Sequence, residues 1–231
     1  MKTIGIVGGI APASTIEYYK YLIDAYRQTS PGGAYPSIVI NSIDPRRMLG
    51  MMDAGDMSGT IEYLVSALRV LADAGVDLSL FASNTPHVLF DEIRSQSPVP
   101  LISIVEAARD EAQRRGFRRV GLLGTGFTMR ATFYRDAFAA AGIALVAPDP
   151  ADIALVHDKY MAELVPVVYR DDTRAAILDV IERLRAAHNL DGMVFGGTEL
   201  PLLIPPDSHP ELGILDTMRA HVDAAVSQML A

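Results

Sequence analysis

Short apolar segments alternate along the chain with longer segments in which apolar residues recur every three or four positions. Most of the short segments are bounded by Gly, Pro or Asp, a pattern typical of buried strands in parallel sheets. The segments predicted as strands are 3–7, 37–41, 78–82, 101–102, 119–123, 144–146, 192–195 and 212–215.

Helical periodicity fills most of the intervals between these strands. The predicted helices are 15–29, 57–74, 105–115, 128–141, 173–187 and 217–230. Each half therefore has four predicted strands and three predicted helices in alternation. This alternation predicts parallel sheets that are covered by helices and joined by right-handed crossovers.

The two halves of the chain repeat one pattern. Ile4-Gly5-Ile6-Val7-Gly8 precedes Tyr18, and Val120-Gly121-Leu122-Leu123-Gly124 precedes Tyr134, with one offset throughout (120 − 4 = 116 and 134 − 18 = 116). We therefore predict an α/β protein of two pseudo-symmetric domains, each a roughly four-stranded parallel sheet flanked by helices. A ligand cleft is expected between the domains, because ligands bind beyond the carboxyl ends of parallel strands.

Composition narrows the class of protein. The 231 residues are 50% hydrophobic and carry a net charge of −8, without a block of basic residues, so a nucleic-acid surface is not expected. No apolar stretch is long enough for a membrane helix, and the first apolar run is too short for a signal peptide, so we expect a cytoplasmic protein that does not bind membranes.

The chain contains no cysteine, which excludes a disulfide, a thiolate metal site and a thiol nucleophile. No His, Asp or Glu spacing is typical of a metal site, and we predict none. The glycine turns that end 3–7 and 119–123 match neither common nucleotide-binding motif.

Small polar residues follow the predicted strand ends. Thr85 precedes a proline, as at a helix start, and Thr125, Thr128 and Thr198 occupy comparable turns in the second half. Backbone N–H groups at helix starts attract carboxylates or phosphates, so these turns predict a small anionic ligand. The simpler alternative is that the hydroxyls only cap helices.

Several motifs in sequence order resemble the aspartate/glutamate racemase family, which comprises cofactor-independent amino-acid racemases. The resemblance covers nearly the whole chain. The matching motifs are Gly-Ile-Val-Gly-Gly-Ile at residues 5–10, Ala-Ser-Asn-Thr-Pro-His at 82–87, Leu-Gly-Thr at 123–125 and Gly-Gly-Thr-Glu-Leu-Pro at 196–201. The resemblance implies an isomerase that needs no pyridoxal phosphate or other cofactor.

The chain departs from the family pattern at two positions. Racemases of this family use two cysteines, in the patterns Cys-Asn-Thr and Gly-Cys-Thr-Glu, to transfer protons on opposite faces of the α-carbon. Here Ser83 stands in the first position and Gly197 in the second. A serine hydroxyl is a much poorer base than a thiol, and glycine has no side chain, so two-thiol chemistry is not available.

The resemblance also implies roles for individual residues. Those expected to bind substrate are Asn84, Thr85, Thr125, Thr128, Thr198 and Gly197, with Arg47 and Lys159 near a distal carboxylate. Ser83 and Glu199 are the candidates for proton transfer. Each has a structural alternative, because Ser83 fits a tight turn and Glu199 suits the first turn of a helix.

The resemblance further implies that the C-terminal helix belongs to the first domain, with boundaries at 1–103 plus 211–231 and 104–210, and that the protein is a homodimer. The predicted function is racemisation of a small acidic amino acid by proton transfer at the α-carbon. Two alternatives remain: a catalytically silent protein that binds an amino acid or dicarboxylate, and a lyase or decarboxylase.

Overall fold

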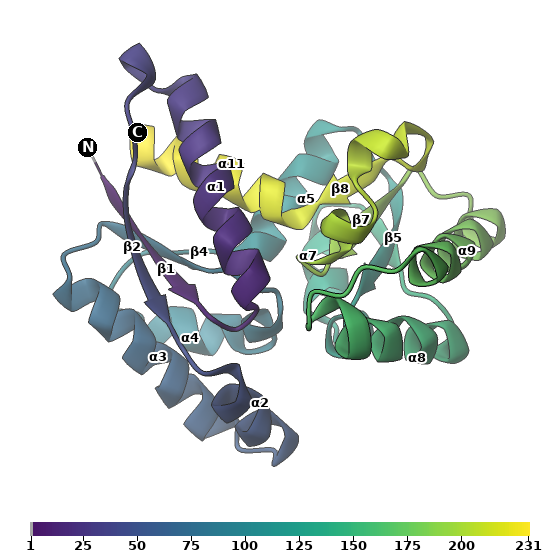
Figure 1. The fold of residues 1–231 in the computed structure, drawn as a ribbon, viewed down its shortest axis with the longest axis horizontal. Coiled ribbons are helices and arrows are strands. Elements are labelled where there is room, and N and C mark those ends of the chain that lie inside the picture. Colours follow the sequence, from purple (N-terminus) through teal and green to yellow (C-terminus); the bar gives the residue numbers. More distant parts are fainter. Residues whose placement is uncertain (1) are drawn as a thin grey trace. The chain divides into compact units, whose positions relative to one another are not determined.

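The computed structural model describes residues 2–231 and divides into two compact units (Figure 1). The first unit runs to Ile104 and includes His221–Ala231, and the second comprises Val105–Ala220. The C-terminal helix α11 (Thr217–Leu230) contains the second boundary. Each unit therefore has its own sheet and its own core.

The sheet of the first unit has the order β2-β1-β3-β4, and all its strands are parallel. The strands are β1 (Thr3–Gly8), β2 (Ser37–Ser42), β3 (Leu78–Phe81) and β4 (Leu101–Ile102). The central strand β1 pairs with both neighbours, so that Ile4 lies opposite Ile38 on one side and Leu78 on the other. Apolar residues of β1 are fully buried, which explains the uninterrupted apolar run in the sequence.

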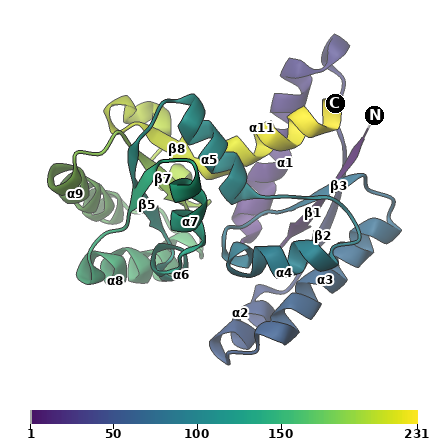
Figure 2. The same ribbon diagram turned by 180° about the vertical axis from the view of Figure 1, so that it is seen from behind.

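Helices cover this sheet. They are α1 (Pro12–Thr29), α2 (Pro45–Asp53), α3 (Met57–Asp73), α4 (Phe90–Gln96) and the residues of α11 from His221 onward. Residues of α2, α3 and α4 form one apolar core with Val7 and Phe81, and Figure 2 shows α3 and α4 together. On α1, Tyr18 is fully buried, and its hydroxyl lies 2.8 Å from Nδ1 of His221 on α11.

The sheet of the second unit repeats this order as β6-β5-β7-β8, again parallel. Its strands are β5 (Arg119–Gly124), β6 (Ala144–Val146), β7 (Gly192–Gly196) and β8 (Ile214–Asp216). Its helices are α5 (Ile104–Arg114), α6 (Gly126–Arg130), α7 (Phe133–Ala140), α8 (Pro150–Lys159), α9 (Asp171–His188) and α10 (Leu200–Leu203). A π-helical turn, Tyr160–Leu164, continues α8.

The repeat seen in the sequence is a repeat of structure. The bounds of β5 are those of β1 displaced by 116 residues (119 − 3 = 116 and 124 − 8 = 116). Tyr18 and Tyr134 are both fully buried at the same offset. The prediction of two α/β halves with four parallel strands each is therefore confirmed.

All eight predicted strands are present, and differences arise mainly in short helices. The predicted helix 128–141 is interrupted, because Ala131 has extended backbone angles and separates α6 from α7. The helices α2, α4, α8 and α10 were not predicted. With nine, seven, ten and four residues they are too short to show a strong period.

The predicted boundary before residue 211 differs from the structure. It assigns β8 to the first domain, whereas β8 pairs with β7, so that Met193 lies opposite Ile214. The compact second unit accordingly extends to Ala220. The last strand of each half, β4 or β8, completes the sheet of its own unit.

Candidate functional site

The turn after β3 carries the first group of predicted site residues. Ser83 and Asn84 are buried, and Thr85 is partly buried. The 3-10 helix that follows, Thr85–Leu89, has Asn84 rather than Thr85 at its N-cap, so the predicted capping role of Thr85 is wrong. Instead, the N–H of Thr85 donates to the Ser83 hydroxyl over 3.4 Å, and the N–H of His87 donates to the Asn84 carbonyl at 3.0 Å.

His87 supports this turn from within the core of the first unit. Its Nε2 accepts from the N–H of Ile104 at 3.2 Å, and its ring stacks on Phe90 with centroids 4.6 Å apart. Burial holds the pKa of His87 well below its usual value, and His221 lowers it further. The neutral imidazole therefore carries its proton on Nδ1, which lies near the carbonyls of Asn84 and Ser83 but makes no full hydrogen bond.

The turn after β7 has a different composition. Gly197, Thr198 and Glu199 are all buried. The N-cap of α10 is Glu199 and not Thr198, and its side chain does not cap the helix, so the capping predicted for these two residues is wrong. The Thr198 hydroxyl instead donates to Oε2 of Glu199 at 3.0 Å.

Tyr160 completes this second cluster and is the residue that sequence reasoning missed. Its hydroxyl donates to Oε2 of Glu199, and the N–H of Glu199 donates back to the tyrosine oxygen at 3.3 Å. Burial raises the pKa of Tyr160 well above its usual value, and the neighbouring Glu199 adds to the shift. Tyr160 is therefore a neutral phenol bound to a buried carboxyl group.

Tyr160 also fills the space beside Gly197. A Cβ added to Gly197 would lie 2.6 Å from both Cε2 and the hydroxyl oxygen of Tyr160. Such distances are well below normal contact, so no larger residue fits at position 197 while Tyr160 keeps its place. The ring of Tyr160 thus occupies the space that a side chain at position 197 would fill.

The threonines after β5 form a small capping arrangement. Thr125 is the N-cap of α6, and its hydroxyl accepts from the N–H of Thr128 at 3.4 Å, which confirms the helix start predicted there. The two hydroxyls lie 3.3 Å apart. The N–H of Gly126 donates to Nδ1 of His157 at 3.1 Å, so this donor already has a partner.

The predicted partners of a distal carboxylate lie on α2 and at the end of α8. Arg46 pairs with Asp44 at 3.0 Å, whereas the exposed Arg47 places its guanidinium carbon 4.6 Å from the centre of the Tyr63 ring. Stacking uses the face of a guanidinium and leaves the N–H groups at its edge directed elsewhere. Of the two arginines, Arg47 is therefore the better candidate for binding a carboxylate.

Lys159 is already paired. Its Nζ lies 3.1 Å from Oε1 of Glu163, one helical turn further along the chain. Glu163 also accepts from the Thr173 hydroxyl, and this bond together with Lys159 lowers the pKa of Glu163. A substrate carboxylate would have to compete with Glu163 for Lys159.

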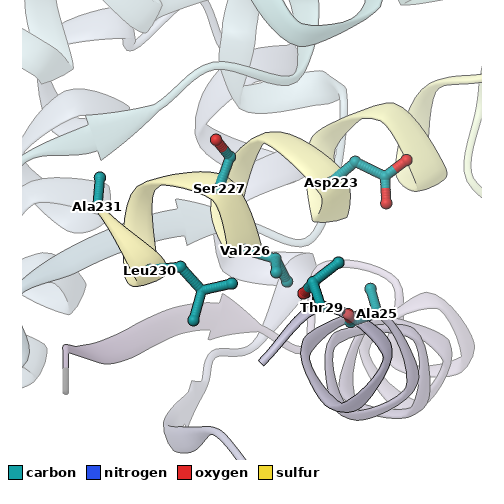
Figure 3. Close-up of a pocket in the computed structure, with 7 residues that line it drawn as sticks. All are labelled: Ala25, Thr29, Asp223, Val226, Ser227, Leu230 and Ala231. Carbon is teal, nitrogen blue, oxygen red and sulfur yellow. Dashed lines mark hydrogen bonds between the residues drawn. The ribbon is translucent and has the colours of Figure 1, made fainter. Parts of the chain in front are cut away.

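Other features of residues 2–231 do not resemble a catalytic centre. No cluster of three or more His, Asp or Glu that could hold a metal ion is found in this range, nor is any helix long and apolar enough to cross a membrane. A groove of about 550 Å³ lies between the last turns of α1 and α11, lined by Ala25, Thr29, Asp223, Val226, Ser227, Leu230 and Ala231 (Figure 3). Because α1 starts beyond the carboxyl end of β1 and runs back, this groove lies away from the strand-end turns.

The fold and its turns define the class: an α/β protein with two parallel sheets of one strand order and buried polar turns at the strand ends. The chain matches the model of the Asp/Glu/Hydantoin racemase family over residues 7–225. It belongs to this family.

Individual relatives agree with this assignment. The chain is 25% identical to the broad specificity amino-acid racemase RacX of Bacillus subtilis (strain 168), an alignment that covers 99% of this chain and 98% of that protein. It is 28% identical to the glutamate racemase of Aquifex aeolicus (strain VF5) over 62% of this chain and 54% of that protein, so it spans about half the length of that relative.

Solved structures agree on the fold. The structure of an aspartate racemase homologue from Pyrococcus horikoshii OT3 has 32% sequence identity and a TM-score of 0.85, with both chains covered completely. Arylmalonate decarboxylase, at 16% identity and a TM-score of 0.55, shares the fold alone over 99% of this chain and 93% of its own.

Proposed function

We propose that this protein is an amino-acid isomerase that acts without pyridoxal phosphate and transfers a proton at the α-carbon of a small acidic amino acid. Membership of the Asp/Glu/Hydantoin racemase family supports this reaction class. The full-length match to RacX, named as a broad specificity amino-acid racemase, supports an amino acid as the substrate.

One observation carries the proposal. Two sheets of the same strand order each end their third strand in sequence, β3 and β7, in a buried polar turn, Ser83-Asn84 in one and Gly197-Thr198-Glu199 in the other. Repetition of such turns at the strand ends, where ligands bind in parallel sheets, favours binding of substrate there.

Substrate contacts are assigned by chemistry. The proposed ligands of the amino and α-carboxylate groups are Asn84, Thr85, Thr125, Thr128, Gly197 and Thr198. Arg47 is proposed for the distal carboxylate because a guanidinium edge binds a carboxylate with two parallel hydrogen bonds. Lys159 can assist only where it is released from Glu163.

Proton transfer must use groups other than thiols. Glu199 supplies the carboxyl group in the second unit, and Ser83 supplies a hydroxyl in the first. Because the Ser83 oxygen accepts a backbone N–H, its own hydrogen is left to be donated. The proposed pair is therefore unequal, with an acid–base carboxyl group at Glu199 and a weak hydroxyl donor at Ser83.

Solvent exchange tests this function. The protein is incubated in D2O with each enantiomer of aspartate and glutamate, and loss of the Cα–H signal is followed by NMR while chiral chromatography follows the enantiomers. We expect exchange together with appearance of the opposite enantiomer for at least one substrate. Ser95→Ala, an exposed serine on α4, is the matched control for Ser83→Ala.

The absence of a side chain at Gly197 favours a second candidate, a one-way lyase or decarboxylase that needs only one proton donor. Release of carbon dioxide without inversion of substrate would identify it. Binding of aspartate by calorimetry without exchange or product would instead identify a silent binding protein, and would contradict the isomerase.

A further inference from the structure

Tyr160 and Glu199 form a buried pair that the function assigned above does not fully use. Both side chains are at most 3% exposed, and Glu199 accepts from both Tyr160 and Thr198 on the same oxygen, Oε2. The phenol oxygen in turn accepts from the N–H of Glu199. Tyr160 and Glu199 are therefore held to each other in two directions.

The position of the phenol is the second observation. The hydroxyl of Tyr160 lies 2.6 Å from the point where a Cβ on Gly197 would stand. A side chain at position 197 would extend from that point, so the hydroxyl stands where the first atoms of such a side chain would lie. The hydroxyl oxygen of Tyr160 therefore occupies space that a side chain at position 197 would fill, although Tyr160 lies 37 positions earlier in the sequence (197 − 160 = 37).

The backbone around Tyr160 is irregular in a way that suits this placement. Tyr160 begins a single π-helical turn, and such turns are frequent at functional sites. A few residues on, Val167 has a φ of 65°, which is unfavourable for a β-branched residue. Tyr160 therefore stands where regular α8 ends and the π-helical turn begins.

We propose that the Tyr160 hydroxyl, backed by the Glu199 carboxyl group, is the proton-transfer group at position 197, an assignment that rests on the proposed isomerase function. In this proposal the Tyr160 oxygen receives the α-hydrogen, which makes Tyr160 the catalytic residue. Glu199 acts through Tyr160 and positions it.

The proposed step is balanced in protons and electrons. In deprotonation, the Tyr160 hydroxyl passes its proton to the Glu199 carboxylate while the phenol oxygen takes the α-hydrogen from carbon. The C–H electron pair remains on the substrate as the carbanion, Tyr160 is again a phenol, and Glu199 is a carboxylic acid. Protonation reverses each bond change, so no other reactant is required.

The neutral state of Tyr160 suits this role. A phenol with a raised pKa stays protonated near neutral pH and is ready to donate to a carbanion. Its transient ionisation is limited because the carboxylate takes up the proton as the phenol receives another. A structural tyrosine would satisfy the buried carboxylate equally well, so the test must separate chemistry from folding.

Three variants provide that separation. Tyr160→Phe keeps the ring beside Gly197 and removes only the hydroxyl, while Glu199→Gln keeps the shape and removes the acid–base group. Tyr134→Phe is the matched control, because Tyr134 is also fully buried in the second unit and hydrogen-bonds a side chain, that of Thr217. All three are compared with the unaltered protein by NMR exchange of aspartate in D2O and by calorimetric binding of aspartate.

We expect Tyr160→Phe to exchange the α-hydrogen about 100-fold more slowly or worse, as for loss of one acid–base group, with aspartate affinity within about 3-fold. Tyr134→Phe should keep the exchange rate. Glu199→Gln should also exchange slowly, because the phenol then lacks a carboxylate that can take up its proton.

Outcomes separate this inference from the function beneath it. Exchange in the unaltered protein that survives in Tyr160→Phe overturns the role of Tyr160 and leaves the isomerase standing. Equal loss of exchange and of binding in Tyr160→Phe also overturns it, because the residue would then be structural. Absence of exchange of aspartate and glutamate in the unaltered protein overturns the isomerase and this inference together.

Discussion

The turn after β3 and the turn after β7 stand at the same place in two sheets of the same strand order. The first is held by a bond from the Thr85 N–H to the Ser83 hydroxyl and one from the His87 N–H to the Asn84 carbonyl, with the neutral ring of His87 behind it. The second encloses a carboxyl group and a phenol, with Tyr160 pressed against Gly197. The repeat therefore duplicates the position of a turn, while its chemistry depends on the side chains that pack behind it.

The largest expected difference between the two units is in stability at acid pH, because the first unit contains two buried neutral histidines, His87 and His221. Burial lowers the pKa of His221 to about 4 and holds that of His87 well below its usual value. The unfolded chain binds these protons below about pH 6.5, so stability is complete above that pH and falls as the pH drops toward 4. His221 alone should cost about 2 kcal/mol of unfolding free energy between pH 7 and pH 5.

Urea unfolding at pH 7 and pH 5 measures this effect. His221→Gln should remove about 2 kcal/mol of the pH dependence by that linkage, whereas His188→Gln, an exposed histidine of the second unit, should leave it unchanged. An unaltered pH dependence in His221→Gln would show that His221 is not a buried neutral group.

Adding a side chain at Gly197 is the next strongest way to sharpen the comparison. Gly197→Ala forces a Cβ to within 2.6 Å of Tyr160 and should cost about 1–3 kcal/mol of stability, the usual range for overpacking. Gly50→Ala is the control, because the Cβ there meets nothing within 4 Å and alanine favours the helix α2. Urea unfolding of both variants gives the difference.

A double-variant cycle tests the cause of that penalty. In a Tyr160→Leu background the ring atoms are gone, so the cost of Gly197→Ala should shrink. An equal cost in both backgrounds would show that Tyr160 does not occupy the space beside Gly197. The same geometry predicts that a cysteine at position 197 is tolerated only when Tyr160 is made smaller.

The smallest effect is expected at Ser83, where the first turn already carries a side chain. Ser83→Ala removes an acceptor that sits 3.4 Å from the Thr85 N–H and should cost about 0.5–1 kcal/mol. Ser83→Cys keeps the volume nearly unchanged and should cost less. Thermal unfolding with Ser95→Ala as reference measures the loss of stability in both variants. A loss for Ser83→Ala as large as that for Gly197→Ala would contradict the difference in packing between the two turns.

Local sequence patterns determined the two sheets of this molecule and the residues that stand at the ends of their strands. The apolar runs and the 116-residue repeat predict both sheets, because a buried parallel strand must be apolar on both faces and bounded by chain-turning residues. The same patterns place Ser83 and Gly197 at strand ends, since a strand that ends in small polar residues must present them at the edge of its sheet. The cap at Thr125 was predicted for the same local reason.

Only the tertiary structure decided what surrounds those turns. The contact between Tyr160 and Gly197 depends on where the end of α8 packs against β7, and no period along the chain encodes a distance across 37 residues. The pairing of β8 with β7 and the bond between Tyr18 and His221 on α11 are likewise choices among several packings. Local patterns determine which residues leave the sheet edge, whereas packing between distant segments determines which chemical groups meet them.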